Sequence, residues 1–185
     1  SSNPKDKGLS RQHIMKALND SLQRLGTDYI DLYQAHAFDP VTPIEESLDA
    51  LNECVKSGKV RHIGCCNFSA WQTLKCNYLS RQHNASSYIS LQMQYSLLCR
   101  TIEYEHVPFA IDQNIGILAW SPLSGGILAR NIEDSNRLGG RHRVGTDAFS
   151  KEKLNKPKNK EIISTLCTLA HRANLPAGRG LLRGR

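Results

Sequence analysis

Four short runs of mainly apolar residues, each bounded by polar or turn-forming residues, divide the chain at regular intervals. Short runs with β-branched and aromatic side chains are typical of strands that are buried in a sheet. The runs begin at residues 29, 60, 88 and 116, so they follow one another after 31, 28 and 28 residues. We therefore predict four buried strands, over residues 29–36, 60–66, 88–93 and 116–120.

Elsewhere the apolar residues recur every three or four positions, which is the period of an amphipathic helix. Residues 9–25 show this most clearly, with Ser10 expected as the N-cap and Gly26 as the residue that ends the helix. Four further helices are expected. Two of them cover residues 44–55 and residues 160–172. Another begins after Ser69 and carries Trp71, Leu74 and Leu79, and the last covers residues 103–113 and is interrupted by Pro108.

A strand and a helix that alternate every 30 residues or so require parallel strands with helices packed outside them. The even spacing favours a barrel over an open doubly wound sheet, and no GxGxxG segment follows any predicted strand. A complete (β/α)8 TIM barrel takes about 250 residues. We therefore expect an α/β fold that forms a partial (β/α)8 barrel of about four to five βα units, whose open sheet edges would permit self-association.

The composition narrows the class of protein. Of 185 residues, 39% are hydrophobic and 22% are charged, and no apolar run approaches the roughly 20 residues of a membrane helix. Residues 1–150 hold 15 basic and 15 acidic residues, whereas residues 151–185 hold nine and two. This distribution argues against nucleic-acid binding, which needs a basic face on the folded part. We expect a barrel over residues 1–150, continued by a last helix and a basic, irregular tail over 151–185.

Six scattered cysteines form no CxxC pair and no spacing typical of a zinc site. This pattern is typical of reduced thiols, so we expect a cytoplasmic protein without a bound metal. The polar first residues also lack the apolar core of a signal peptide.

Candidate chemistry lies where the predicted strands end. The four strands finish at His36, at Cys66 and Asn67, at Gln92 and Gln94, and at Trp120 and Ser121. Parallel barrels build their sites at this rim, so the convergence of polar and aromatic residues predicts a ligand site. Taken singly, His36 could close its strand and bond a loop carbonyl, Asn67 could be a helix-entry or turn residue, and Trp120 could be a large core residue. The set contains no carboxylate pair, and Asp39 is the only acid near it.

Four segments resemble the aldo-keto reductase family, in order and spacing, from about residue 8 to residue 128. They are Leu25-Gly-Thr-Asp-Tyr-Ile-Asp-Leu-Tyr-Gln-Ala-His36, Gly58-Lys-Val-Arg-His-Ile-Gly-Cys-Cys-Asn-Phe-Ser69, Gln92-Met-Gln-Tyr-Ser96 and Ala119-Trp-Ser-Pro-Leu-Ser124. The Trp before Ser-Pro-Leu looks closest to the aryl-alcohol dehydrogenase-like and potassium-channel β-subunit-like branches. The resemblance implies an oxidoreductase that uses NADPH to reduce small aldehydes or ketones to alcohols.

The resemblance also implies roles for single residues. His36 would orient the substrate carbonyl, and Asn67 and Gln92 would hold the nicotinamide carboxamide. Cys66 stands where the family often has Ser, and a thiol is the weaker hydrogen-bond partner. Trp120 would stack on the nicotinamide ring. The remaining cofactor-binding residues would be Ser121, Pro122, Leu123, Ser124, Gly125 and Gly126 around the pyrophosphate, and Arg130 beyond them.

The family's catalytic Asp, Tyr and Lys belong to strands that would precede residue 1, and its last strand would follow residue 185. The chain is therefore expected to be a fragment that lacks the first strands and the last strand, and to be inactive by itself. The alternative is a non-catalytic module that binds the cofactor or a partner. Substrate identity, the preference for NADP over NAD and the oligomeric state stay open.

Overall fold

A computed structural model describes residues 7–129 and 155–175 of the chain. They belong to two compact units: Ser1–Met93 with Ile102–Leu118, and Gln94–Thr101 with Ala119–Arg185. Each unit is treated separately below. The domain boundary that we predict at residue 150 lies outside the described residues and stays a prediction.

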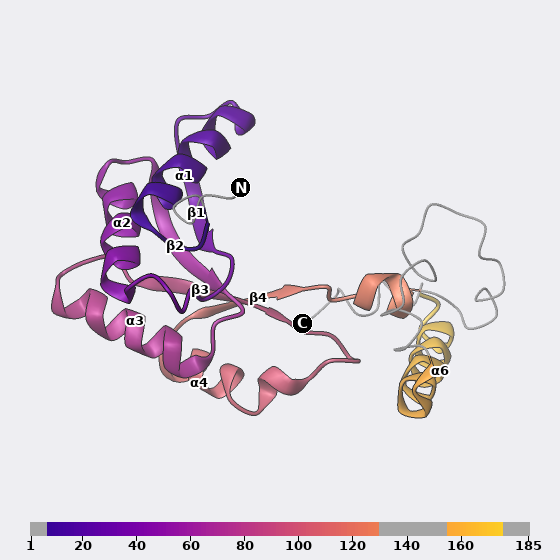
Figure 1. Ribbon diagram of the computed structural model, residues 1–185. Helices are drawn as coiled ribbons and strands as arrows, with labels where there is room; N and C mark the ends of the chain where they lie inside the picture. The colour runs from indigo at the N-terminus through magenta and orange to yellow at the C-terminus, as the bar shows by residue number, and fades with distance from the viewer. Residues whose placement is uncertain (1–6, 130–154, 176–185) are drawn as a thin grey trace. The chain divides into compact units, whose positions relative to one another are not determined.

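The described strands form a four-stranded sheet (Figure 1). Its strands are β1 (Ile30–Ala35), β2 (Val60–Cys66), β3 (Tyr88–Gln94) and β4 (Gly116–Trp120), in the order β1-β2-β3-β4. The pairs β1-β2 and β2-β3 are parallel. All four predicted strands are confirmed to within one residue at either end, and so is the parallel sheet of a partial (β/α)8 barrel.

One helix precedes the first strand, and three more lie in the connections between successive strands. They are α1 (Arg11–Leu25), α2 (Ile44–Lys56), α3 (Ala70–Gln82) and the short α4 (His106–Asp112), which follows a 3-10 turn η2 (Thr101–Glu103). Tyr33 of β1 donates a hydrogen bond from its hydroxyl to the carbonyl of Ile14 in α1, and Cys65 of β2 contacts Thr73 of α3. The outer helices that we predict are therefore confirmed.

The predicted helix ends are confirmed by their capping geometry. Ser10 accepts a hydrogen bond from the backbone N–H of His13, and Gly26 ends α1 in the left-handed conformation, with φ of 65°. Ser69 and Gln72 form a reciprocal capping box at the start of α3, which directly follows the end of β2. Local sequence thus determines where α1 and α3 begin.

The buried face of α3 differs from what its apolar residues indicate. Trp71 is 58% exposed and Leu74 is 43% exposed. The side that packs on the sheet consists of small or polar residues: Ala70, Thr73, Cys76, Asn77 and Ser80. Asn77 explains this orientation, because its side chain donates to the carbonyl of Tyr88 at 3.0 Å and accepts from the backbone N–H of Tyr88 at 2.8 Å. This contact joins α3 to the start of β3.

The two remaining helices also differ from their predicted ranges. Helix α4 covers 106–112 instead of 103–113, and Pro108 lies in its first turn, where a backbone N–H has no helical partner to lose. In the second unit, α6 (Pro157–Arg172) begins three residues earlier than expected, because Pro157 is suited to the first helical position. None of the helices in the described ranges is long and apolar enough to cross a membrane.

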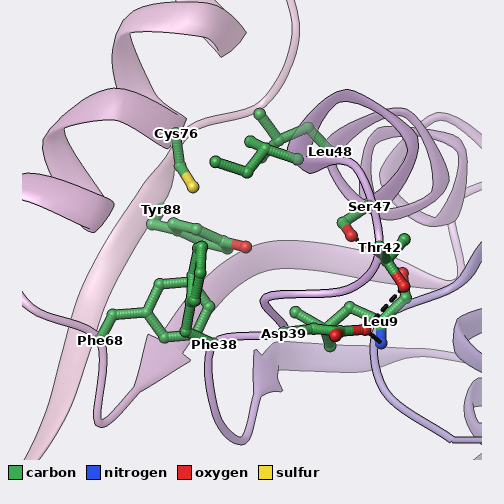
Figure 2. A pocket seen from close by; sticks show the side chains of 10 residues that line it. Leu9, Phe38, Asp39, Thr42, Ser47, Leu48, Phe68, Cys76 and Tyr88 are labelled. Carbon is green, nitrogen blue, oxygen red and sulfur yellow. Dashed lines mark hydrogen bonds between the residues drawn. The ribbon is translucent and has the colours of Figure 1, made fainter.

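The loop after β1, which carries His36, is held by the Asp39 carboxylate. It accepts hydrogen bonds from the backbone N–H of Leu9 at 2.8 Å, from the backbone N–H of Val41 at 2.9 Å and from the hydroxyl of Thr42 at 2.6 Å. Figure 2 shows Asp39 directed toward Leu9 and Thr42. The carboxylate thus ties the residues before α1 to the loop that leaves β1.

Beside this anchor, three aromatic rings close the core of the first unit (Figure 2). Phe68, which is 1% exposed, lies edge-on to Phe38 at 5.4 Å between centroids and to Tyr88 at 5.8 Å. The gap that remains between the rings and Asp39 is only about 10 Å³. This volume is about that of one water molecule, so the cavity is too small for a substrate.

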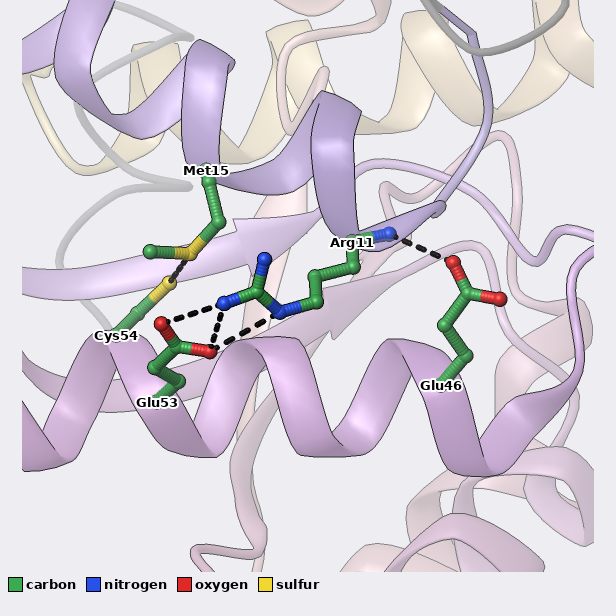
Figure 3. Close-up of polar contacts among 5 residues, drawn as sticks. All are labelled: Arg11, Met15, Glu46, Glu53 and Cys54. Atoms are coloured by element: carbon green, nitrogen blue, oxygen red, sulfur yellow. Dashed lines mark hydrogen bonds and ion pairs between the residues drawn. The ribbon is translucent and has the colours of Figure 1, made fainter.

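Helices α1 and α2 are joined by polar contacts at their surface (Figure 3). The Arg11 guanidinium binds both carboxylate oxygens of Glu53, at 2.8 and 2.6 Å, and the Arg11 backbone N–H donates to Glu46 at 3.0 Å. Underneath, the sulfur atoms of Met15 and Cys54 lie 3.6 Å apart. Because Arg11 and Glu53 are about half exposed, the ion pair adds little stability beyond orienting the helices.

Candidate functional site

Three neighbouring strand ends of the first unit bring four of the predicted site residues together. His36 directly follows β1 and is exposed, Cys66 ends β2, Asn67 follows it, and Gln92 lies in β3. The register places Cys66 opposite Gln92, and it places the residue before His36 opposite Cys65. The prediction that these side chains share one rim is consistent with this geometry; their roles stay predictions.

Asn67 occupies a backbone conformation that few residue types adopt. Its φ is 57°, in the left-handed region where Asn is enriched, and its backbone N–H donates to the carbonyl of Gln92 at 3.0 Å. The turn that follows is held from α4, where the His106 ring lies 3.2 Å, through Nε2, from the carbonyl of Phe68. Asn67 is therefore a turn residue, and its role in binding a ligand stays a prediction.

Sequence reasoning missed one residue of this region, Gln34. Its side-chain Nε2 donates to Oε1 of Gln92 at 2.6 Å, across the intervening strand β2. The signal was present in the sequence, since Gln34 is an amide in a mostly apolar strand, two positions before His36 and thus on the same face. The register that pairs Gln34 with Gly64 was not visible from the sequence.

The thiols near the rim are neutral. Burial raises the pKa of Cys66, and burial raises the pKa of its neighbour Cys65 to about 12, although the Thr73 hydroxyl opposes the shift. None of the six cysteines, all of which lie among the described residues, forms a disulfide. Cys66 is only 2% exposed, so it can contribute a weak S–H donor to a ligand but not a thiolate.

Asp39, the acid that the sequence places three residues after His36, does not have the properties of a proton donor. Burial alone would raise the pKa of its carboxyl group, but hydrogen bonds from the Thr42 side chain and from the backbone of Leu9, Val41 and Thr42 outweigh burial. Together they lower the pKa to about 2. At neutral pH the carboxylate is ionised and its oxygen atoms are occupied by these donors.

The second unit contains the loop that follows β4. Trp120 ends the strand and is partly buried, and the next residues turn sharply. Four of them have positive φ: Ser121 (52°), Ser124 (51°), Gly125 (71°) and Gly126 (96°). Such conformations turn backbone N–H groups inward and are common in anion-binding loops.

The interior of this loop is tightly folded. The N–H groups of Ser124 and Gly126 donate to the carbonyls of Ser121 and Leu123, at 2.8 and 3.0 Å. Leu123 packs on a small core of Ile127, Leu128 and Ile163, while Pro122 is exposed. The Ser124 hydroxyl is buried and has no hydrogen-bond partner within the described ranges. Arg130 lies outside the described residues.

Other kinds of site find little support. No group of three or more His, Cys, Asp and Glu side chains in the described part of the chain could hold a metal ion. An open hollow of about 510 Å³ lies at the start of β4, lined mainly by apolar residues of α4, of β4 and of the turn between them, which also contributes Asn114. It contains none of the predicted site residues. The strand ends that carry His36 and Gln92 thus remain the candidate site.

Comparison with known proteins agrees with this fold. The family model "Aldo/keto reductase family" matches residues 2–183, and the chain belongs to this family. A Schizosaccharomyces pombe protein named "Putative aryl-alcohol dehydrogenase C977.14c" is 38% identical over 168 residues, covering 91% of this chain and 47% of that protein.

Two further relatives come from different organisms. The versiconal hemiacetal acetate reductase of Aspergillus parasiticus is 41% identical over 141 residues, which are 76% of this chain and 40% of the relative. The "Uncharacterized oxidoreductase YrpG" of Bacillus subtilis is 39% identical over 160 residues, 86% of this chain and 49% of the relative. The chain spans about half the length of the curated relatives it matches.

Proposed function

We propose that the protein acts as a cytoplasmic oxidoreductase that reduces a small aldehyde or ketone to the alcohol, with NADPH as its cofactor. The observation that carries the proposal is the rim of the first unit, where His36, Cys66, Asn67 and Gln92 stand at the ends of three adjacent strands. The names of the relatives, an aryl-alcohol dehydrogenase, a hemiacetal acetate reductase and an oxidoreductase, support the same class of reaction.

The residues of this rim suit the carboxamide end of a nicotinamide. A carboxamide both donates and accepts hydrogen bonds, and the side-chain amides of Asn67 and Gln92 can do the same. The hydrogen bond between the Asn67 backbone and the Gln92 carbonyl keeps the two residues adjacent. When bound, NADPH would supply the hydride for the carbonyl carbon. The chain's contribution is to hold and orient the ring that carries this hydride.

His36 is proposed to orient the substrate. Its exposed imidazole follows β1 directly, and a ring N–H can donate a hydrogen bond to the carbonyl oxygen of an aldehyde or ketone. Negative charge develops on that oxygen during reduction, so this bond strengthens in the transition state. A proton must also reach the oxygen. The family assigns this step to a Tyr assisted by Lys and Asp, and none of these three has a counterpart in this sequence.

Within the second unit we propose that Trp120 stacks on the nicotinamide ring. We also propose that the loop from Ser121 to Gly126 binds phosphate groups. The positive φ values of the loop and the buried, unpartnered hydroxyl of Ser124 support phosphate binding. Glycines at 125 and 126 allow the backbone to approach phosphate oxygens closely.

Binding and turnover can be measured separately. We would titrate the protein, expressed as its complete natural chain, with NADPH and with NADH, and then follow NADPH consumption with an aromatic aldehyde. His36→Ala should lower kcat by about 10² to 10³ and leave the Kd of NADPH unchanged. His83→Ala, at the far end of α3, is the matched control and should change neither value.

Three outcomes decide between the alternatives. NADPH binding with turnover that depends on His36 supports the oxidoreductase. NADPH binding without turnover supports the non-catalytic, cofactor-binding module. A protein that binds neither NADPH nor NADH contradicts both.

A further inference from the structure

The polar face of β1, β2 and β3 contains an amide pair that spans the sheet. Gln34 of β1 donates from Nε2 to Oε1 of Gln92 in β3, and their separation of 2.6 Å makes this a short hydrogen bond. The strand between them, β2, contributes Gly64, which pairs with Gln34 on one side and with Ser90 on the other. Two side chains from strands that are not neighbours thus meet above a glycine.

Gly64 makes the hydrogen bond between Gln34 and Gln92 sterically possible. Strands β1 and β3 are two strand spacings apart, about 9.6 Å, so the Gln34 side chain must cross over β2 to reach Gln92. A Cβ atom on Gly64 would overlap the Ser90 hydroxyl and would lie 3.3 Å from Oε1 of Gln34. The missing side chain therefore leaves the space that the amide pair occupies.

The hydrogen bond also determines which way the Gln92 amide points. Since Nε2 of Gln34 can only donate, the Gln92 oxygen must face Gln34, and the Gln92 Nε2 group must face away from it. Oε1 of Gln34 and the Ser90 hydroxyl are both buried and lack partners among the described residues. Both lie beside Gly64, close to the position that a Cβ atom would take there.

We propose that Gln34 is a positioning residue, which orients the Gln92 side chain so that its Nε2 group donates to the carbonyl oxygen of the cofactor's carboxamide. This inference rests on the proposed function, because it takes Gln92 as a contact of the nicotinamide. It adds a direction to that contact: Gln92 recognises the oxygen of the carboxamide and not its nitrogen. Gln34 lies on the same face as His36, about 7 Å earlier along β1.

Three ligands test this direction by equilibrium binding to the complete natural chain. They are NADP⁺, its 3-acetylpyridine analogue, which keeps the carbonyl oxygen but lacks the amide nitrogen, and 2′,5′-ADP, which has no nicotinamide. Gln34→Met removes the donor at nearly constant volume. We expect the Kd of NADP⁺ and of the analogue to rise by the same factor, about fivefold to tenfold, and the Kd of 2′,5′-ADP to stay within twofold.

Further variants provide the controls. Gln34→Glu keeps the shape but can only accept when ionised, so it should turn the Gln92 amide around and weaken NADP⁺ binding at least as much as Gln34→Met. It also serves if Gln34→Met does not fold. Gln82→Met, at the exposed end of α3, is the matched control and should bind all three ligands like the unmodified protein.

The results distinguish a failure of this inference from a failure of the proposed function. If Gln92→Ala weakens NADP⁺ binding but Gln34→Met does not, the positioning role is wrong and the nicotinamide contact stands. Equal weakening of 2′,5′-ADP by Gln34→Met would mean a structural role only, which also overturns the inference. If Gln92→Ala leaves NADP⁺ binding unchanged, both proposals fail.

Discussion

The carboxylate of Asp39 offers the sharpest test of how the first unit is held together. Its three hydrogen bonds join the residue before Ser10 to the loop after β1, and they lower its pKa from 3.8 to about 2 in spite of burial. A shift of this size corresponds to about 2.4 kcal/mol at 1.36 kcal/mol per pH unit. Because Asp39 is partly exposed, solvent screening reduces the expected contribution to about 1–2 kcal/mol.

Asp39→Asn should therefore lower the free energy of unfolding by about 1–2 kcal/mol at pH 7. The folded pKa lies below the unfolded value, so the contribution is present above about pH 4 and is lost as the pH falls toward 2. The difference between the two proteins should stay constant from pH 7 to pH 5 and shrink to about half by pH 3. Urea unfolding followed by circular dichroism at these three pH values measures it.

Asp31→Asn is the control for the loss of a negative charge as such. Asp31 is exposed and its carboxylate binds only the guanidinium of Arg61, at 2.7 Å, so its replacement should cost less than about 0.5 kcal/mol. Our reasoning would be refuted if Asp39→Asn cost the same at pH 3 as at pH 7, or no more than the control.

Three further substitutions are checked by the same unfolding assay. Asn77→Ala leaves two buried backbone groups of β3 without partners and should cost about 2–5 kcal/mol, whereas Asn19→Ala, at an exposed contact, should cost less than about 0.5. Gly64→Ala forces a Cβ into occupied space and should cost about 1–3 kcal/mol; an unchanged midpoint would contradict the close approach. Phe68→Ala should cost about 3–5 kcal/mol, because Phe68 is buried, and Trp71→Ala should cost less than about 1 kcal/mol, because Trp71 is exposed on α3. A loss from Trp71→Ala as large as that from Phe68→Ala would contradict the exposed position of Trp71.

The candidate site was only partly predictable, and the reason lies in the geometry of a parallel sheet. Residues at strand ends can be found from the sequence, because every strand of such a sheet ends at the same edge. This rule selected His36, Asn67 and Gln92 as candidates, and their roles stay predictions. It does not tell which side chains touch across strands, and the bond between Gln34 and Gln92 depends on a register that two intervening connections determine.

Asp39 is a second case in which the sequence does not reveal the partners of a side chain. The sequence shows that it lies three residues after His36, but not that its carboxylate is occupied by hydrogen bonds from Leu9 and Thr42. Leu9 is 30 residues away in sequence, so no local pattern indicates this contact. The pKa of a side chain depends on its three-dimensional neighbours, and this value could come only from the folded structure.

The sequence by itself determined the local elements of this protein: the four strands, the start of α1 at Ser10 and of α3 at Ser69, and the alternation that produces a parallel sheet. These depend on the period of apolar residues and on capping groups within a few residues of each other. The tertiary structure alone decided which face of α3 is buried and which amide Gln34 meets above Gly64. Both depend on hydrogen bonds between residues far apart in the chain, whose energy exists only once the strands are in register.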